Sequence, residues 1–235
     1  MALFRRNSKA EVDETAADVE LDTVEEAAEP ARTHGPWDSG DAGIDDRPRV
    51  DLGALRLPGV PGMELRMEID KATNSVSAAS VNFDGSTLQL QAYAAPRTDG
   101  IWDEIRAEIE QSIVGQGGSV DDVPGPFGRE LLARLPARTS DGRTSHRPAR
   151  FLGVDGPRWF LRGVITGRAA VEPAAAQVLE QVFGAVVVVR GADARPPRDL
   201  LTLTLPGPAP APAEAEAEQP SFDPLTRGPE ITETR

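Results

Sequence analysis

Hydrophobic and polar residues alternate along several segments of the chain, and this period of two predicts β-strands. The longest alternation covers 63–70, where two methionines, a leucine and an isoleucine are each followed by a charged residue. Such a strand has one face buried and the other face exposed to solvent. Two further apolar segments, 76–83 and 87–93, are separated by Asp84-Gly85, a pair typical of a two-residue β-hairpin.

The strongest hairpin pattern lies between two apolar segments, 144–154 and 158–166. They flank Asp155-Gly156, and we expect the turn at this pair. Aromatic residues make up only 5% of the chain, yet two of the large ones are neighbours in the second segment. We therefore expect this hairpin at the centre of the fold.

A period close to 3.6 predicts two helices. From residue 100 or 101 to Val114, isoleucines and a tryptophan recur on one side and form an apolar stripe, and Asp99 is placed to cap the first turn. The second helix begins at Pro173, which suits the first helical position, and ends just before Gly184.

The remaining segments complete the predicted order of elements. Residues 116–128 are rich in glycine, proline and aspartate and predict a loop, whereas 130–135 predict a short strand. A run of valines over 185–189 predicts a strand covered on both faces, and 201–205 predict a last strand at an edge. The sequence thus predicts an α+β fold, in which two helices cover one face of a mostly antiparallel sheet of about six to seven strands.

A weak similarity links the two halves of this order. In each half an Asp-Gly pair is followed by a strand and then by a helix, over 84–114 and over 155–183. Duplication of a ββα unit would produce this similarity, and so would chance, because Asp-Gly pairs are common in turns. The sequence leaves both explanations open.

Composition separates a central domain from two tails. Residues 1–49 contain 13 acidic and six basic residues, and residues 206–235 contain six and two, within a chain of net charge −13. Both segments lack the apolar content that would offset the entropy of folding. We expect disordered acidic tails at 1–49 and 206–235, the second rich in proline, alanine and glutamate, around a single α+β domain over 50–205.

Charge is also distributed unevenly inside this domain. Residues 51–125 carry 12 acidic and five basic residues, whereas 126–168 carry nine arginines and three acidic residues. In a regular strand two of these arginines, at 158 and 162, share the face of Phe160. Two arrangements stay open, because guanidinium groups favour carboxylate or phosphate partners: pairing with the acidic 51–125 region, or binding of an outside anion. The candidate contacts for an anion or a partner are Arg143, Arg147, Arg150, Arg158 and Arg162.

The sequence offers few residues for catalysis or metal binding. It has no cysteine, which excludes thiol chemistry and fits a reducing cytoplasm, and its two histidines cannot build a multi-histidine metal centre. His146 has no carboxylate placed to orient it, so we expect an exposed histidine on a solvated strand. The glycines of 115–118 follow a helix instead of opening one, which favours a helix cap over a phosphate loop. We expect no catalytic residue, no metal, no cofactor and no membrane span.

Several short motifs of the central region resemble a known family. They are Leu57-Pro58-Gly59-Val60-Pro61-Gly62-Met63-Glu64, Tyr93-Ala94-Ala95-Pro96-Arg97, Trp102 and Arg158-Trp159-Phe160-Leu161-Arg162-Gly163-Val164. Through these motifs the region 50–205 resembles an uncharacterised actinobacterial family, domain of unknown function 3710. The resemblance leaves both tails outside and supplies no catalytic residues.

Two functional hypotheses follow from these observations. The first is a non-enzymatic cytoplasmic interaction module with a protein partner, supported by the lack of a nucleophile–base pair or a metal-ligand set in the sequence. The second is a binder of an anionic ligand, a nucleotide or a nucleic acid, through the arginine-rich hairpin. A set of arginines gathered on one face of the domain would favour the second hypothesis, and arginines paired with the acidic region would favour the first.

Overall fold

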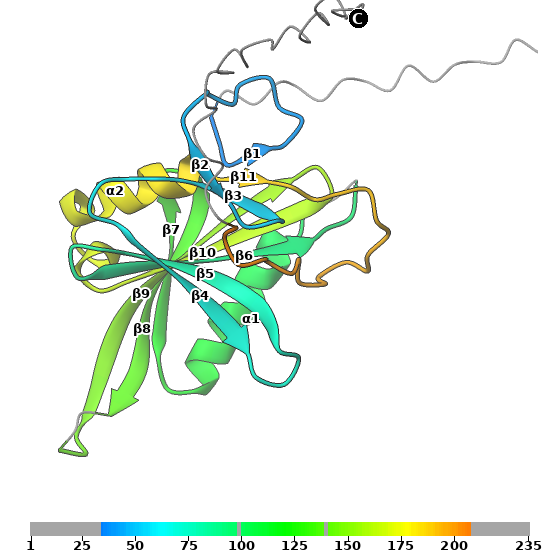
Figure 1. Ribbon diagram of the computed structural model, residues 1–235. Coiled ribbons are helices and arrows are strands. Elements are labelled where there is room, and N and C mark those ends of the chain that lie inside the picture. The colour runs from blue at the N-terminus through cyan, green and yellow to red at the C-terminus, as the bar shows by residue number, and fades with distance from the viewer. Residues whose placement is uncertain (1–33, 98–99, 139–140, 208–235) are drawn as a thin grey trace, which may run out of the picture. The chain divides into compact units, whose positions relative to one another are not determined.

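The computed structural model describes residues 34–97, 100–138 and 141–207 of the chain (Figure 1). The predicted disorder of the tails mostly concerns residues outside this part, namely 1–33 and 208–235, and the predicted helix cap Asp99 also lies outside it. Within the described residues, no helix has the length and apolar character needed to cross a membrane.

Seven strands form one antiparallel sheet, in the order β4-β5-β6-β10-β9-β8-β7. Together with two helices this sheet confirms the predicted α+β class and the predicted number of strands. The strands are β4 (Glu64–Asp70), β5 (Ser75–Phe83), β6 (Ser86–Ala94), β7 (Ser119–Gly125), β8 (Gly128–Arg138), β9 (Thr144–Gly156) and β10 (Trp159–Thr166).

A second, smaller sheet has the order β1-β11-β3-β2. Its strands are β1 (Trp37–Asp38), β2 (Arg49–Asp51), β3 (Leu55–Pro58) and β11 (Val187–Val188). Because β1 pairs with β11 in parallel, ordered structure begins well before residue 50, where we expected it to start. The valine run over 185–189 therefore supplies a short buried strand of this sheet. The last expected strand, 201–205, forms only single bridges through Leu203.

The two hairpin turns illustrate one correct and one wrong prediction. Asp84 and Gly85 have φ angles of 45° and 71°, as a type I′ turn between β5 and β6 requires, which confirms the predicted turn. The β9–β10 turn instead uses Pro157 and Arg158, because Trp159 pairs with Gly156. Arg158 has a φ of 61°, and proline followed by a residue with positive φ is typical of a type II turn.

The predicted loop over 116–128 is wrong over 119–125, which form a strand. The α1 helix (Trp102–Gly115) ends in a Schellman motif, where the N–H of Gly118 donates to the Ile113 carbonyl and the N–H of Gly117 donates to the Val114 carbonyl. Strand β7 follows directly and pairs with β8 at the edge of the large sheet. Its two neighbouring aspartates and its proline hide the strand pattern, and such residues are common on exposed edges.

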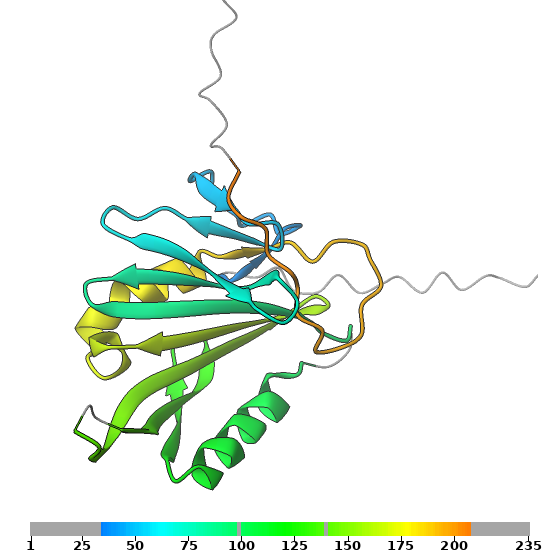
Figure 2. The same ribbon diagram turned by 60° about the horizontal axis from the view of Figure 1, so that its bottom comes forward.

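The helices cover opposite faces of the large sheet, not one face as we expected (Figure 2). A Cβ atom on Gly153 of β9 would overlap the ring of Trp102 in α1, which therefore lies directly on the strand. In the same way, a Cβ on Gly163 of β10 would overlap the ring of Phe183 in α2 (Pro173–Gly184). Since Gly153 pairs with Arg162, the residue beside Gly163, these two glycines face opposite sides.

The opposite positions of the helices also decide between duplication and chance. The meanders β4-β5-β6 and β8-β9-β10 meet at the antiparallel β6–β10 pair. A two-fold axis that exchanged them would run perpendicular to the sheet and would place both helices on the same face. The helices lie on opposite faces, so duplication of a ββα unit does not explain the sequence similarity.

Candidate functional site

The five candidate arginines do not form one surface. Arg150 of β9 lies on the face that α2 covers, whereas Arg162 of β10 lies on the face that α1 covers. Arg158 lies in the turn between these strands, and Arg143 and Arg147 lie at the exposed start of β9. About 20 Å of strand, at 3.3 Å per residue, separates Arg147 from the residue paired with Arg162.

Arg150 is the buried centre of an ion-pair triad. Its Nε and Nη2 donate to the two carboxylate oxygens of Glu130, both at 3.0 Å, and Nη2 also lies 2.8 Å from Oε1 of Glu180 in α2. Burial alone would lower the pKa of Arg150, but the hydrogen bonds and charges of the two carboxylates outweigh burial and raise this pKa. Arg150 therefore joins the sheet to α2, and its Nε and Nη2 are already engaged by carboxylates of the protein.

Among the described residues, no ion pair joins Arg147, Arg150, Arg158 or Arg162 to the acidic 51–125 region. Arg150 pairs with acids outside that region, and Arg143 pairs with Asp141 at 3.2 Å. Other arginines of the basic stretch do pair with the acidic region: the pairs are Arg129 with Asp122, Arg134 with Asp121, and Arg168 with Asp84. The predicted charge compensation thus exists, but through different arginines.

Arg158 serves the local structure of the turn. Its Nη2 donates to the Gly191 carbonyl at 3.2 Å, and its own carbonyl accepts a hydrogen bond from Nε of Arg190 at 3.1 Å. These bonds tie the β9–β10 turn to the segment that follows β11. Arg158 is thus placed away from Arg162, although both were expected on one face of a regular strand.

Arg162 lines a cavity of about 490 Å³ between α1 and the large sheet. Most of the cavity wall is apolar. Ile105 and Ile109 of α1 are half-buried and lie across from residues of β8, β9 and β10, namely Leu135, Phe151 and Phe160. We call this space the Arg162 cavity.

The guanidinium of Arg162 is only partly satisfied. Its Nη2 donates to Oε1 of Gln91, and its Cζ lies 5.6 Å from the ring centroid of Tyr93. Among the described residues, Nε of Arg162 is the only buried side-chain nitrogen or oxygen without a hydrogen-bond partner. No carboxylate of the described chain pairs with this arginine. A half-buried cation with one buried, unpaired donor therefore lines the cavity.

Tyr93 supports Arg162 and lines the same cavity. Burial raises the pKa of the Tyr93 hydroxyl, although the nearby positive charge of Arg162 opposes part of this effect. The phenol therefore remains protonated at neutral pH. Its ring also stacks against Phe160, which in turn stacks against Trp102 of α1.

A second arginine at the rim is already neutralised. The two Nη groups of Arg198 donate to Glu108 and Glu104 of α1, each at 2.8 Å. The hydrogen bond to Glu108 is the main reason that the pKa of Arg198 is raised. The rim therefore carries two carboxylates for one guanidinium, and Arg162 is the cation of the cavity that lacks a carboxylate partner within the described residues.

Comparison with protein-family models decides the family. Residues 35–211 match the model described as protein of unknown function, DUF3710. The chain belongs to this family. The match confirms the resemblance seen in the sequence, and it begins just before β1, in agreement with the early start of ordered structure. No curated protein and no solved structure matches the chain significantly.

In this DUF3710 domain, α1 is held over the cavity by a residue distant in sequence. The carboxylate of Asp155 accepts hydrogen bonds from the N–H groups of Ile101, at 2.9 Å, and Trp102, at 3.2 Å. Gly100 allows this approach, because a Cβ there would overlap the Asp155 side chain. Asp155 is thus a helix cap supplied by β9, a role that its position in an Asp-Gly pair concealed.

Replacing Asp155 with alanine should lower the free energy of unfolding of the DUF3710 domain by about 1 kcal/mol, the usual loss for a helix cap. The two N–H groups at the start of α1 would lose a charged acceptor. Urea unfolding followed by circular dichroism measures this change. Glu110→Ala, on the exposed side of the same helix, is the matched control and should change stability by less than about 0.5 kcal/mol.

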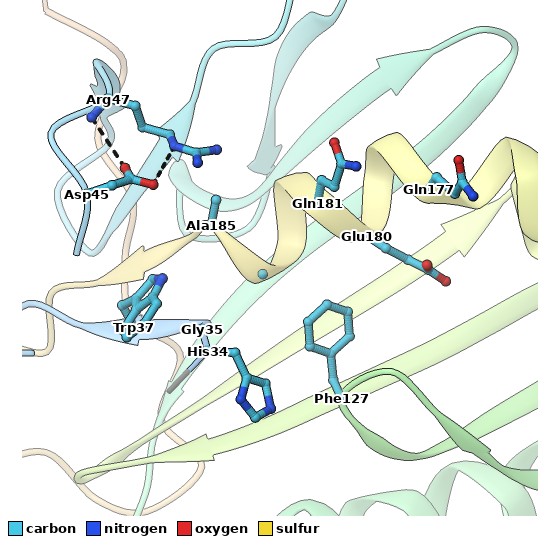
Figure 3. Close-up of a pocket in the computed structure, with 11 residues that line it drawn as sticks. His34, Gly35, Trp37, Asp45, Arg47, Phe127, Gln177, Glu180, Gln181 and Ala185 are labelled. Carbon is cyan, nitrogen blue, oxygen red and sulfur yellow. Dashed lines mark hydrogen bonds and ion pairs between the residues drawn. The ribbon is translucent and has the colours of Figure 1, made fainter. Parts of the chain in front are cut away.

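Two further cavities among the described residues have charged groups that are less suited to a ligand. One of about 730 Å³ lies beside α2 and is lined by Trp37, Phe127 and Glu180 (Figure 3). Its Asp45 pairs with Arg47 at 2.6 Å, and its Glu180 belongs to the Arg150 triad. The charges at this cavity are therefore paired.

Another cavity, of about 540 Å³, lies near the start of β9. It is lined by His146 and Arg147, which are both exposed to solvent. The exposure of His146 on β9 confirms the prediction for this histidine. Solvent screens and hydrates exposed cations, so this cavity offers a ligand less binding energy than the half-buried Arg162 does.

Most residues that build the Arg162 cavity were not among the sequence candidates. Arg162 was found, but Tyr93, Gln91 and Arg198 were not. A signal for Tyr93 and Gln91 does exist, since they alternate with buried alanines and leucines along β6 and therefore share one face. Arg198 lies in an irregular segment, and only the tertiary structure brings it to α1.

Proposed function

We propose that the DUF3710 domain is a non-enzymatic binding module that holds a small anionic ligand in the Arg162 cavity. The observation that carries this proposal is Arg162, which lines an apolar cavity and whose buried Nε has no acceptor among the described residues. Leaving a buried donor unpaired costs about 1–3 kcal/mol, and more for a charged group. An anion in the cavity would supply the missing acceptor.

This proposal combines the two hypotheses drawn from the sequence and narrows the second. Nucleic acids bind through several cations spaced along the phosphate backbone. Arg150 and Arg162 lie on opposite faces of the sheet, and Arg150 is already paired twice. The geometry therefore favours a small ligand at one arginine over a nucleic acid along the hairpin. The proposed site is in the cytoplasm, as the lack of cysteine suggests.

The dye 8-anilinonaphthalene-1-sulfonate tests this proposal, because it combines aromatic rings with a single negative charge. Titration into the full chain should show one site by enhanced fluorescence, and Arg162→Gln should weaken it about ten- to hundredfold, the usual effect of losing a charge-assisted hydrogen bond. Arg147→Gln is the matched control, since Arg147 is an exposed arginine of the same hairpin, and it should leave the affinity unchanged.

Two results would contradict the proposal. One is equal weakening by Arg162→Gln and Arg147→Gln, which would indicate attraction of the dye to the general surface charge. The other is salt-sensitive binding of single-stranded DNA that is unchanged in Arg162→Gln. This result would favour the nucleic-acid hypothesis instead.

A further inference from the structure

We infer that the Arg162 cavity selects a monocarboxylic acid with an apolar body, and rejects phosphates and other multiply charged anions. This inference rests on the proposed function and gives its ligand a chemical class. The simplest model ligand is a medium-chain fatty acid such as octanoate. Three features of the cavity support this class.

The first feature is the form of the donor. A guanidinium is planar, and Nε together with a neighbouring Nη can donate to both oxygens of one carboxylate. In Arg162 the contact with Gln91 uses Nη2, and the plane is supported by the ring of Tyr93. Nε is the donor left over. Tyr93 keeps its proton at neutral pH, so it does not compete with a ligand for the positive charge.

The second feature is the charge balance around the cavity. Arg162 is its one cation without a carboxylate partner in the described part of the chain, and this charge matches a single negative charge. Glu104 and Glu108 at the rim share the charge of Arg198 and leave a net negative charge there. A phosphate dianion or a polyphosphate would be repelled by this rim, and the second cation there, Arg198, is already paired with two carboxylates.

The third feature is the apolar wall. Side chains of α1 and of the sheet face the cavity from two sides, and the volume of about 490 Å³ is in the usual range for small-molecule sites. Ile105 and Ile109 are only half-buried, although they belong to the apolar stripe of α1. An aliphatic or aromatic body between them and Phe151 would complete their burial.

Isothermal titration calorimetry with the full chain tests this inference with three probes of equal chain length: octanoate, 1-octanol and octyl phosphate. Octanoate should bind at least about tenfold more tightly than either of the others, because only octanoate offers one planar charge to Arg162. Shortening octanoate to hexanoate should weaken binding by about fourfold for each methylene removed.

Three variants separate the failure of this inference from the failure of the proposed function. Arg162→Gln should lower the affinity for octanoate to that for octanol. Arg162→Lys should recover part of the lost affinity, because lysine keeps the positive charge but lacks the planar group that donates two parallel hydrogen bonds. Ile109→Trp fills the cavity and should abolish the binding of all three probes. Circular dichroism melting curves establish that each variant is folded.

The binding results distinguish failure of the carboxylate inference from failure of the proposed function. If octanoate and octanol bind equally and Ile109→Trp abolishes both, the cavity binds ligands but the carboxylate inference is wrong. Tighter binding of octyl phosphate than of octanoate also overturns the inference. If neither Arg162→Gln nor Ile109→Trp changes the binding of any probe, both the inference and the proposed function are wrong.

Discussion

Replacing Arg150 with alanine should lower the free energy of unfolding by about 3–5 kcal/mol, the usual cost of removing one partner from a buried ion pair. The substitution would leave the carboxylates of Glu130 and Glu180 next to each other without their shared cation. Only 8% of the Glu130 side chain is exposed, so water cannot replace the lost guanidinium. Urea unfolding at neutral pH measures the loss.

A charge-free triad is the informative control for this prediction. Arg150→Met combined with Glu130→Leu and Glu180→Leu removes all three charges and keeps most of the volume. Apolar replacement of a buried ion pair is often neutral or stabilising, so this triple variant should be clearly more stable than Arg150→Ala. A loss below about 1 kcal/mol for Arg150→Ala would mean that the triad is not formed in solution.

Replacing Trp159 with alanine should also cost about 3–5 kcal/mol, as is typical for a large buried aromatic side chain. Trp159 is fully buried in the main core, and its Nε1 donates to Oδ2 of Asp38 at 2.7 Å. This bond links the large sheet to β1 of the small sheet. The substitution would therefore create a cavity and leave the Asp38 carboxylate without this donor.

Two variants divide this loss between packing and the hydrogen bond. Trp159→Phe keeps most of the ring and removes the N–H, and Asp38→Ala removes the acceptor. Each should be less destabilising than Trp159→Ala, with a loss nearer 1–3 kcal/mol. If Trp159→Ala unfolds at the same urea concentration as the wild type, Trp159 is not part of the core.

The sequence predicted the local elements well because each follows from a short-range pattern. The alternation over 63–70 became β4, and Pro173 does begin α2. The Asp-Gly pairs show the limit of such patterns. Asp84-Gly85 forms its turn, but Asp155 lies within reach of two N–H groups of α1, and a contact 53 or 54 residues away cannot be read from a dipeptide.

The arrangement of the arginines also depends on long-range structure. In a hairpin with a two-residue turn, each even-numbered residue of one strand pairs with an odd-numbered residue of the other. Two even-numbered residues such as Arg150 and Arg162 therefore face opposite sides of the sheet, as their observed partners Ile165 and Gly153 show. The opposite orientation of these two arginines could thus be predicted from the sequence. The sequence could not predict which helix covers which face, because α1 and α2 are both amphipathic and either could pack on either side. The Arg162 cavity depends on that choice.

The most direct test of the central claim, that a carboxylate ligand binds Arg162, is the ¹H–¹⁵N NMR signal of the Arg162 Nε–H group in the full chain. The signal is assigned by its loss in Arg162→Gln. Titration with octanoate should shift it to lower field, as expected for a new hydrogen bond to a carboxylate, while the Nε–H signal of Arg147 stays in place. An unchanged Arg162 signal at an octanoate concentration that saturates binding would contradict the account.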